Sequence, residues 1–177
     1  IQGAFTWDIY HNPFMNLYVG VLSKLGKSLT FFAAGQILFY ALSISLLIQV
    51  LFRGSIWHVV AIGVAILEPL TMFYNFSLLS ESFFTSFTIG MVAMLLLLFR
   101  EERPVYAFLF GTLMGLAFLA RLSAMIYLPL MGLLLFGGSG HVLGKARNIV
   151  LAVVPFVLCY AFVLFGQQIL NEGGLFT

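Results

Sequence analysis

Long apolar stretches alternate with short polar ones along the whole chain. Residues 29–52 carry no charge, and further apolar runs occupy residues 81–99, 104–120, 122–136 and 149–170. A helix that crosses about 30 Å of hydrocarbon at about 1.5 Å per residue needs roughly 20 apolar residues. Because the runs approach or exceed that length and do not alternate polar with apolar positions, they predict membrane-spanning helices rather than barrel strands.

The order of these runs predicts an all-α fold, a polytopic transmembrane bundle of about six spanning helices plus an N-terminal interfacial helix. The remaining span starts near Ile56 and reaches Glu68-Pro69, where proline ends or kinks the helix. Residues 1–28 mix aromatic rings with charged side chains, which is typical of a segment at the headgroup level. We therefore predict an outer-face interfacial segment, residues 1–28, and a transmembrane helical domain, residues 29–177.

One boundary in this pattern depends on a single charge. Residues 104–136 contain only Arg121, with no glycine or proline beside it. One helix over this stretch would be roughly 50 Å long. It would also hold the arginine near the bilayer centre, where a charge costs about 2.5–3.5 kcal/mol. We therefore predict two short helices, 104–120 and 122–136, that meet at Arg121.

Composition supports the membrane class. The chain is 62% hydrophobic and has a mean hydropathy of +1.11, and its net charge of +2 is too small to indicate a nucleic-acid partner. The single cysteine, Cys159, cannot form an internal disulfide. Ala107, Gly111 and Gly115 form a stripe of small residues that predicts close packing of one helix against another. The chain begins at Ile1 without a methionine, and we expect a fragment of a longer protein.

The basic residues set the predicted orientation. If all six helices cross the membrane, the larger basic group lies on one side, which the positive-inside rule assigns to the cytoplasm: Arg53, Arg100, Arg103, Lys145 and Arg147. The opposite, outer face then gathers the residues with candidate chemistry: Asp8, His11, Lys24, Lys27, Glu68, Glu81 and Arg121.

Two of these residues carry the strongest chemical hypothesis. Arg121 ends a helix, where its guanidinium is either a cation reaching toward the interface or a clamp for a phosphate or pyrophosphate. Glu81 follows Ser80 at the start of a helix. It is either a carboxylate stabilised by the helix dipole or an acid at the mouth of an intramembrane cavity.

The other candidates lie in more polar surroundings. Asp8 is a candidate general base if it reaches an acceptor hydroxyl, and otherwise a solvated loop residue. His11 has no second ligand at metal-binding spacing, so no metal site is predicted. Lys24 and Lys27 share one face, which favours lipid headgroups or a lipid-linked phosphate. Glu68 either ends its helix or lies at the outer interface.

Three segments in this order resemble a known family. They are residues 10–18 (YHNPFMNLY), residues 78–84 (LLSESFF) and residues 111–121 (GTLMGLAFLAR). Together they resemble the GT-C membrane glycosyltransferases, in the branch of protein O-mannosyltransferases and bacterial lipid A aminoarabinose transferases, over roughly residues 10–135. Arg121 is followed by Leu122, where proline is common in that family.

The resemblance implies transfer of a sugar, with inversion, from a polyprenyl-phosphate donor to a lipid, glycan or protein acceptor. It places the site on the outer face of the bacterial cytoplasmic membrane. Glu81 would line the active site, Arg121 would contact the donor phosphate, and His11 and the two lysines would border the cavity. The family's usual catalytic acid would lie before Ile1, which makes Asp8 a substitute candidate. No cofactor follows from the resemblance, and a divalent metal stays open.

Two other function classes fit the same residues. A transporter or flippase for a lipid-linked or small anionic substrate would use the same arginine and glutamates, and it would show repeats and broken helices. A non-catalytic membrane subunit would use the helices only for packing against a partner.

Overall fold

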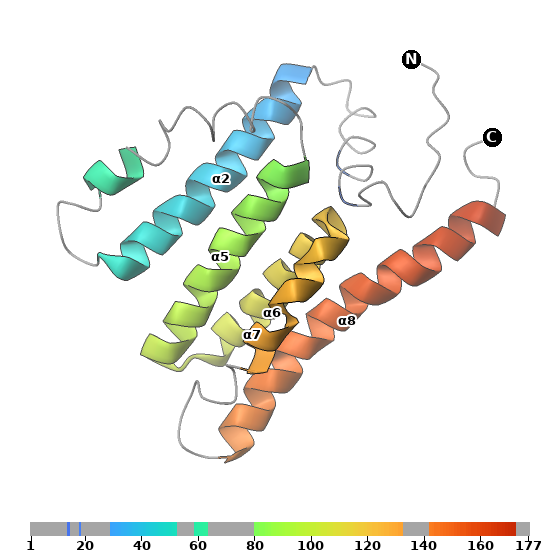
Figure 1. The fold of residues 1–177 in the computed structure, drawn as a ribbon. Helices are drawn as coiled ribbons and strands as arrows, with labels where there is room; N and C mark the ends of the chain where they lie inside the picture. Colours follow the sequence, from blue (N-terminus) through green and yellow to red (C-terminus); the bar gives the residue numbers. More distant parts are fainter. Residues whose placement is uncertain are drawn as a thin grey trace.

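A computed structural model of the chain describes Phe14, Tyr18 and residues 29–52, 59–63, 80–132 and 142–172. Its elements, in chain order, are α2 (Leu29–Leu51), α5 (Ser80–Glu101), α6 (Pro104–Ala120), the 3-10 helix η1 (Leu122–Tyr127), α7 (Leu128–Gly132) and α8 (Val142–Glu172). Residues 59–63 are also helical. Every element in these ranges is a helix, so the predicted all-α class is confirmed for the described part of the chain (Figure 1).

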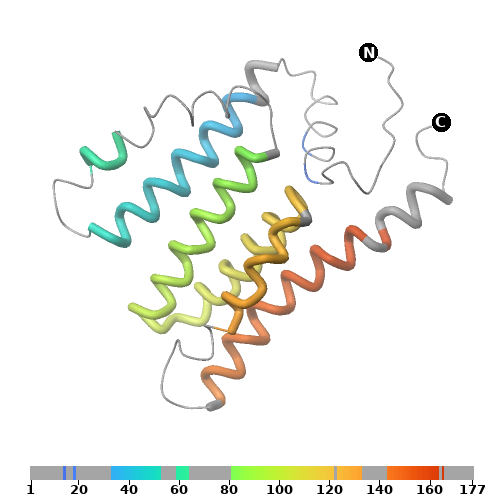
Figure 2. The backbone as a smooth tube through the Cα atoms, viewed as in Figure 1, coloured from blue at the N-terminus to red at the C-terminus, as the bar shows by residue number. Residues whose placement is uncertain are grey.

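The long helices pack in the order α2, α5, α6 and α8 (Figure 1). Helices α5 and α6 form an antiparallel hairpin, whereas α2 runs parallel to α5, as the tube in Figure 2 shows. Helix α8 crosses α6 in the same general direction. At Arg121 the chain turns back into η1 and α7. Each long helix therefore has one end on the side of Glu81 and the other on the side of Arg100.

The hairpin between α5 and α6 follows from local rules. Helix α5 has an acid, Glu81, in its first turn and a base, Arg100, in its last turn, which complements its dipole. Beyond the helix, Glu102 takes a φ of 54°, and its N–H donates to the carbonyl of Leu98 at 3.0 Å. This left-handed residue closes the helix as a glycine commonly does. Pro104 then opens α6 at the position that suits proline.

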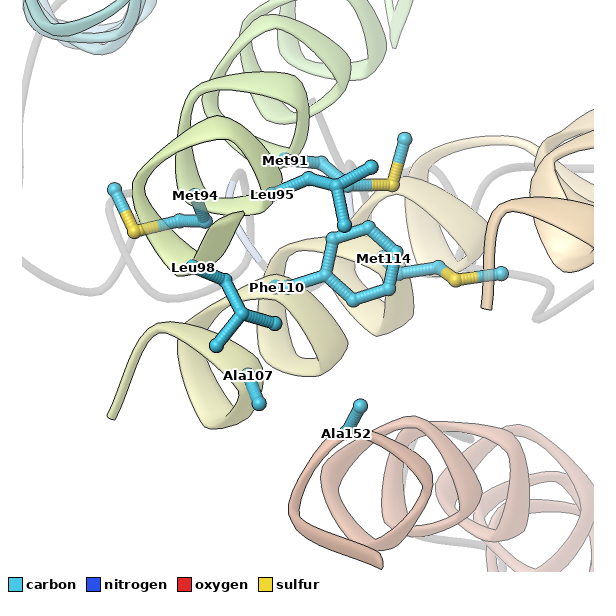
Figure 3. Close-up of a cluster of buried hydrophobic side chains, with 8 residues drawn as sticks. All are labelled: Met91, Met94, Leu95, Leu98, Ala107, Phe110, Met114 and Ala152. Atoms are coloured by element: carbon cyan, nitrogen blue, oxygen red, sulfur yellow. The ribbon is translucent and has the colours of Figure 1, made fainter. Parts of the chain in front are cut away.

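The first buried cluster lies where α5, α6 and α8 meet. Figure 3 shows Leu95 of α5 above the ring of Phe110 of α6 and Leu98 beside that ring, with Ala152 on the neighbouring α8. The full set of buried members is Met91, Met94, Leu95, Leu98, Ala107, Phe110, Met114 and Ala152. Three methionines among them fit the uneven gaps between crossing helices.

The stripe of small residues brings α6 against α8. A Cβ built on Gly111 would overlap the backbone carbonyl of Ala152, and one built on Gly115 would lie 2.7 Å from Sγ of Cys159. Ala107, one turn before Gly111, is fully buried. The close packing predicted from Ala107, Gly111 and Gly115 is therefore confirmed, and these residues let the two helix backbones approach.

Apolar side chains lie on the outside of the bundle as well as in its core. Large apolar side chains such as Leu42 of α2 and Leu158 of α8 are exposed, whereas Gln36, Ser86 and Asn148 are buried. Three helical stretches are long and apolar enough to cross a membrane: Ala33–Leu51, Glu81–Glu101 and Leu143–Val163. An apolar exterior around such helices suits lipid rather than water. The described residues thus support a membrane protein with three candidate spans, while the prediction of about six spans is not confirmed.

The predicted break at Arg121 is confirmed. Arg121 is extended, with φ −153° and ψ 128°, directly after α6 ends at Ala120. Of the helix predicted over residues 122–136, the described part, residues 122–132, is helical but is not confirmed as a span. It is a 3-10 helix followed by α7 rather than one continuous α-helix. Pro129 supplies the physical reason, because an α-helix continuing through it would lose the bond to the carbonyl of Met125. At the second position of α7 the same proline is tolerated.

The last helix begins earlier than predicted. Helix α8 starts at Val142, whereas the apolar pattern predicts residues 149–170. Lys145 and Arg147 therefore belong to the first two turns of α8 and not to a loop. Of the predicted span that starts near Ile56, only residues 59–63 are described, and they are helical. The predicted interfacial helix within residues 1–28 lies outside the described residues except for Phe14 and Tyr18, both of which are helical.

Candidate functional site

Two charged residues far apart in the sequence meet at one end of the bundle. Glu81 lies in the first turn of α5, and Arg121 lies between α6 and η1. Nη1 of Arg121 donates a hydrogen bond to Oε1 of Glu81 at 2.6 Å. The structure therefore brings together the two residues that the sequence predicts on one face, and this ion pair is the centre of the candidate site.

The backbone holds Arg121 in place on both sides. Its N–H donates to the carbonyl of Ala117 at 2.9 Å, which closes α6. Its own carbonyl accepts from the N–H of Ala124 at 3.0 Å, which opens η1. Because the extended residue is bonded in both directions, the base of the side chain is fixed while the guanidinium extends from the helix junction.

Neither partner of the ion pair is deeply buried. The side chain of Arg121 is 41% exposed and that of Glu81 is 40% exposed. Ion pairs with this exposure typically contribute about 0.2–1 kcal/mol, because water competes for both charges. A guanidinium has five N–H donors, and with the described residues Arg121 makes one side-chain hydrogen bond. The pair can therefore open at low energetic cost and offer donors to an anion from outside.

Aromatic rings form one wall of the site. The guanidinium carbon of Arg121 lies 6.0 Å from the centroid of Phe84, at the outer limit of a cation–π contact. Phe84 stacks on Tyr127 of η1, with 5.9 Å between the ring centroids. Sequence reasoning missed both rings. The spacing of three between Glu81 and Phe84 was an available signal, since it puts both side chains on one face of a helix.

A second aromatic group packs beside this end of α5. Phe14 lies edge-on to Phe83 and Phe87, with centroid distances of 4.9 and 5.1 Å. Tyr18 packs on Phe83 at 4.7 Å, and its hydroxyl group fills the space above Gly35. Burial raises the pKa of the Tyr18 phenol, because the charged phenolate loses solvation. These contacts join Phe14 and Tyr18 to the helix that carries Glu81.

The remaining predicted site residues lie outside the described residues: Asp8, His11, Lys24, Lys27 and Glu68. Within the described ranges, no three His, Cys, Asp or Glu residues gather in a way that would hold a metal ion. The chemistry available in these ranges is therefore that of a guanidinium paired with a carboxylate beside aromatic rings. Such a pair can bind an anion and can accept a proton.

Comparisons with protein-family models, curated proteins and solved structures find no match for this chain.

Proposed function

We propose that this chain is part of an inverting membrane glycosyltransferase of the GT-C type. It would transfer a sugar from a polyprenyl-phosphate donor to a lipid, glycan or protein acceptor. One observation carries the proposal: the two most chemically distinctive segments of the resemblance, residues 78–84 and 111–121, supply the two members of one ion pair. An arginine at a membrane interface next to a carboxylate suits the binding of a lipid-linked phosphate.

In this scheme the donor phosphate displaces Glu81 from Arg121. The guanidinium then neutralises the negative charge that grows on the leaving phosphate, which is the kind of stabilisation that contributes most in enzyme sites. Glu81, once released, and Asp8 are the candidate bases for the acceptor hydroxyl. Lys24 and Lys27 would add positive charge beside the phosphate, and His11 and Glu68 would border the same face.

The proposed location is the bacterial cytoplasmic membrane, with the ion pair on the outer face. Arg100, Arg103, Lys145 and Arg147 lie at the end of the bundle opposite the pair (Figure 1). By the positive-inside rule that end faces the cytoplasm.

The test is sugar transfer in membranes containing the full-length protein and a mixture of polyprenyl-phosphate sugars. Arg121→Ala is expected to lower the rate by about 10²–10³, the usual effect of removing one stabilising donor. Arg121→Lys should lower the rate less, since lysine keeps the positive charge but lacks the paired N–H donors of the guanidinium. Arg103→Ala is the matched control, because it removes an arginine whose side chain is 70% exposed at the opposite end.

Two other outcomes would reject the proposal. If the wild type transports an anionic or lipid-linked substrate without any transfer, and Arg121→Ala abolishes that flux, the chain is a transporter or flippase. If the wild type shows neither activity, and Arg121→Ala and Arg121→Lys differ from it only in stability, the ion pair serves only to pack α5 against α6.

A further inference from the structure

The end of the bundle opposite the ion pair carries a basic surface built from three parts of the chain. Arg100 lies in the last turn of α5, Arg103 precedes α6, and Lys145 and Arg147 lie in the first two turns of α8. Figure 2 shows the start of α8 on the same side of the bundle as the turn from α5 to α6. We call these four residues the basic end.

Two members of the basic end already have partners. Nη1 of Arg100 donates to the carbonyl of Val50 at 2.6 Å, which satisfies a free acceptor at the end of α2. Nε of Arg103 lies 3.6 Å from Oε2 of Glu101, which also accepts a bond from the Tyr106 hydroxyl at 2.8 Å. Arg103 is nevertheless 70% exposed, so its guanidinium can still contact a ligand.

Lys145 and Arg147 differ from these two. Within the described part of the chain neither forms an ion pair or a side-chain hydrogen bond, and Arg147 is exposed while Lys145 is half-buried. Among the described residues, the acids on this side are Glu101, engaged as above, and the exposed Glu102. The basic end therefore keeps an excess of positive charge, and it is concentrated on the first turns of α8.

Near the start of its candidate span, Leu143–Val163, helix α8 carries these two cations. Its 31 residues span roughly 46 Å, against about 30 Å of hydrocarbon. In Figure 1 its first turns extend past the ends of α5 and α6. The neighbouring Leu143 and Val150 are 84% and 59% exposed, so the same turns carry an apolar surface that suits acyl chains. Long basic side chains at this end of a span extend toward the interface, where their charges reach the headgroup phosphates.

The two cations also stand at the unfavourable end of their helix. The N-terminus of a helix carries partial positive charge, and acids usually occupy it, as Glu81 does in α5. The first turn of α8 contains no acid. A phosphate from outside the chain would offset both the dipole and the side-chain charges.

We propose that the basic end, through Lys145, Arg147 and Arg103, binds anionic phospholipids of the phosphatidylglycerol type in the adjacent leaflet. The proposal is independent of the glycosyltransferase function, because it concerns the opposite end of the bundle. Each basic residue near an anionic surface changes lipid affinity by roughly fivefold. Removal of both α8 cations should therefore weaken binding by about 25-fold.

The experiment measures lipid binding to the full-length protein in neutral detergent by native mass spectrometry. Phosphatidylglycerol and phosphatidylcholine with identical acyl chains are titrated in parallel. The test variant is Lys145→Gln/Arg147→Gln, and the matched control is Ala146→Gln, which alters the exposed residue between them without removing charge. A second variant, Lys145→Arg/Arg147→Lys, keeps both charges and exchanges their shapes.

The expected result is a preference for phosphatidylglycerol in wild type, in Ala146→Gln and in the charge-retaining variant, and its loss in the neutral variant. Equal binding of the two lipids by wild type overturns the proposal, and so does an undiminished preference in the neutral variant. Soluble glycerol phosphate is the third arm. Competition by glycerol phosphate at concentrations equal to those of the lipid would assign the site to a soluble anion instead. Should the double variant fail to fold, Arg147→Gln alone is expected to lose roughly fivefold.

Discussion

The contact between α6 and α8 at Gly111 allows the clearest quantitative prediction. A methyl group at this position would lie 2.6 Å from both the carbonyl carbon and the Cα of Ala152. Carbon atoms in favourable contact are about 3.5–4.0 Å apart. Since the obstacle is backbone and cannot rotate away, Gly111→Ala forces the two helices apart by about 1 Å along a tightly packed line.

Two other glycines give a graded comparison. At Gly115 the added methyl meets Sγ of Cys159 at 2.7 Å and Cβ at 2.9 Å, and the sulfur can turn aside. At Gly132 it meets nothing within 4 Å. Overpacking typically costs about 1–3 kcal/mol, so we expect about 3 kcal/mol for Gly111→Ala and about 1–2 kcal/mol for Gly115→Ala. Gly132→Ala should be neutral or stabilising by up to about 1 kcal/mol.

The assay uses the only cysteine among the 177 residues. Cys159 contacts Gly115 at the interface between α6 and α8, so a dye that fluoresces on reaction with its thiol reports when these helices separate on heating. Far-UV circular dichroism follows the same transition for Gly115→Ala, whose substitution touches the thiol itself. If Gly111→Ala and Gly132→Ala unfold at the same temperature, the close approach of α6 to α8 is refuted.

Three further predictions use the same thermal assay. A double-mutant cycle of Glu81→Gln with Arg121→Gln should give a coupling of about 0.2–1 kcal/mol, as for other part-exposed pairs, and a value above 2 kcal/mol would contradict the exposed geometry. Arg100→Gln should lower the free energy of unfolding by about 1.5–3 kcal/mol, the range for a hydrogen bond to a charged group, because the carbonyl of Val50 loses its donor. An unchanged unfolding midpoint would show that water replaces the arginine. Glu102→Gly should stabilise by about 1 kcal/mol, because glycine adopts the positive φ of 54° without strain, and any loss of stability would count against that turn.

The sequence was sufficient to predict α2, α5 and α6 because a membrane restricts the composition of the helices that cross it. An apolar run bounded by charges predicts α6 to the residue, from Pro104 to Ala120. It also predicts the break at Arg121, since a buried charge in mid-membrane is costly. After the break the same criterion could not predict the local geometry, because residues 122–136 have the composition of a spanning helix, whereas the described residues 122–132 form a 3-10 helix followed by α7. Hydropathy cannot distinguish a 3-10 turn from an α-helix, and Pro129 was the only local signal that the two differ.

The early start of α8 shows the opposite limitation. Lys145, Arg147 and Asn148 look like loop residues to a hydropathy criterion, yet they belong to the helix. Helix formation depends on backbone hydrogen bonds and packing, and long polar residues such as lysine and arginine have a high helix propensity. Burial of Asn148 against its neighbours, at 2% exposure, is a tertiary effect that no local pattern contains.

In the candidate site, one feature could be predicted from the sequence and another depends on tertiary packing. Two membrane crossings, α5 and α6, separate Glu81 from Arg121. The two residues are therefore predicted on the same face of the membrane, since α5 starts on the side where α6 ends in any antiparallel hairpin. The number of crossings cannot predict the 2.6 Å hydrogen bond between Arg121 and Glu81. That distance depends on the register of the hairpin, and the register depends on the turn. Glu102 in a left-handed conformation and Pro104 at the start of α6 make that turn only two residues long. The ion pair at one end of the hairpin is thus set by the turn at the other, so lengthening the turn by one residue should separate the charges while leaving both helices intact.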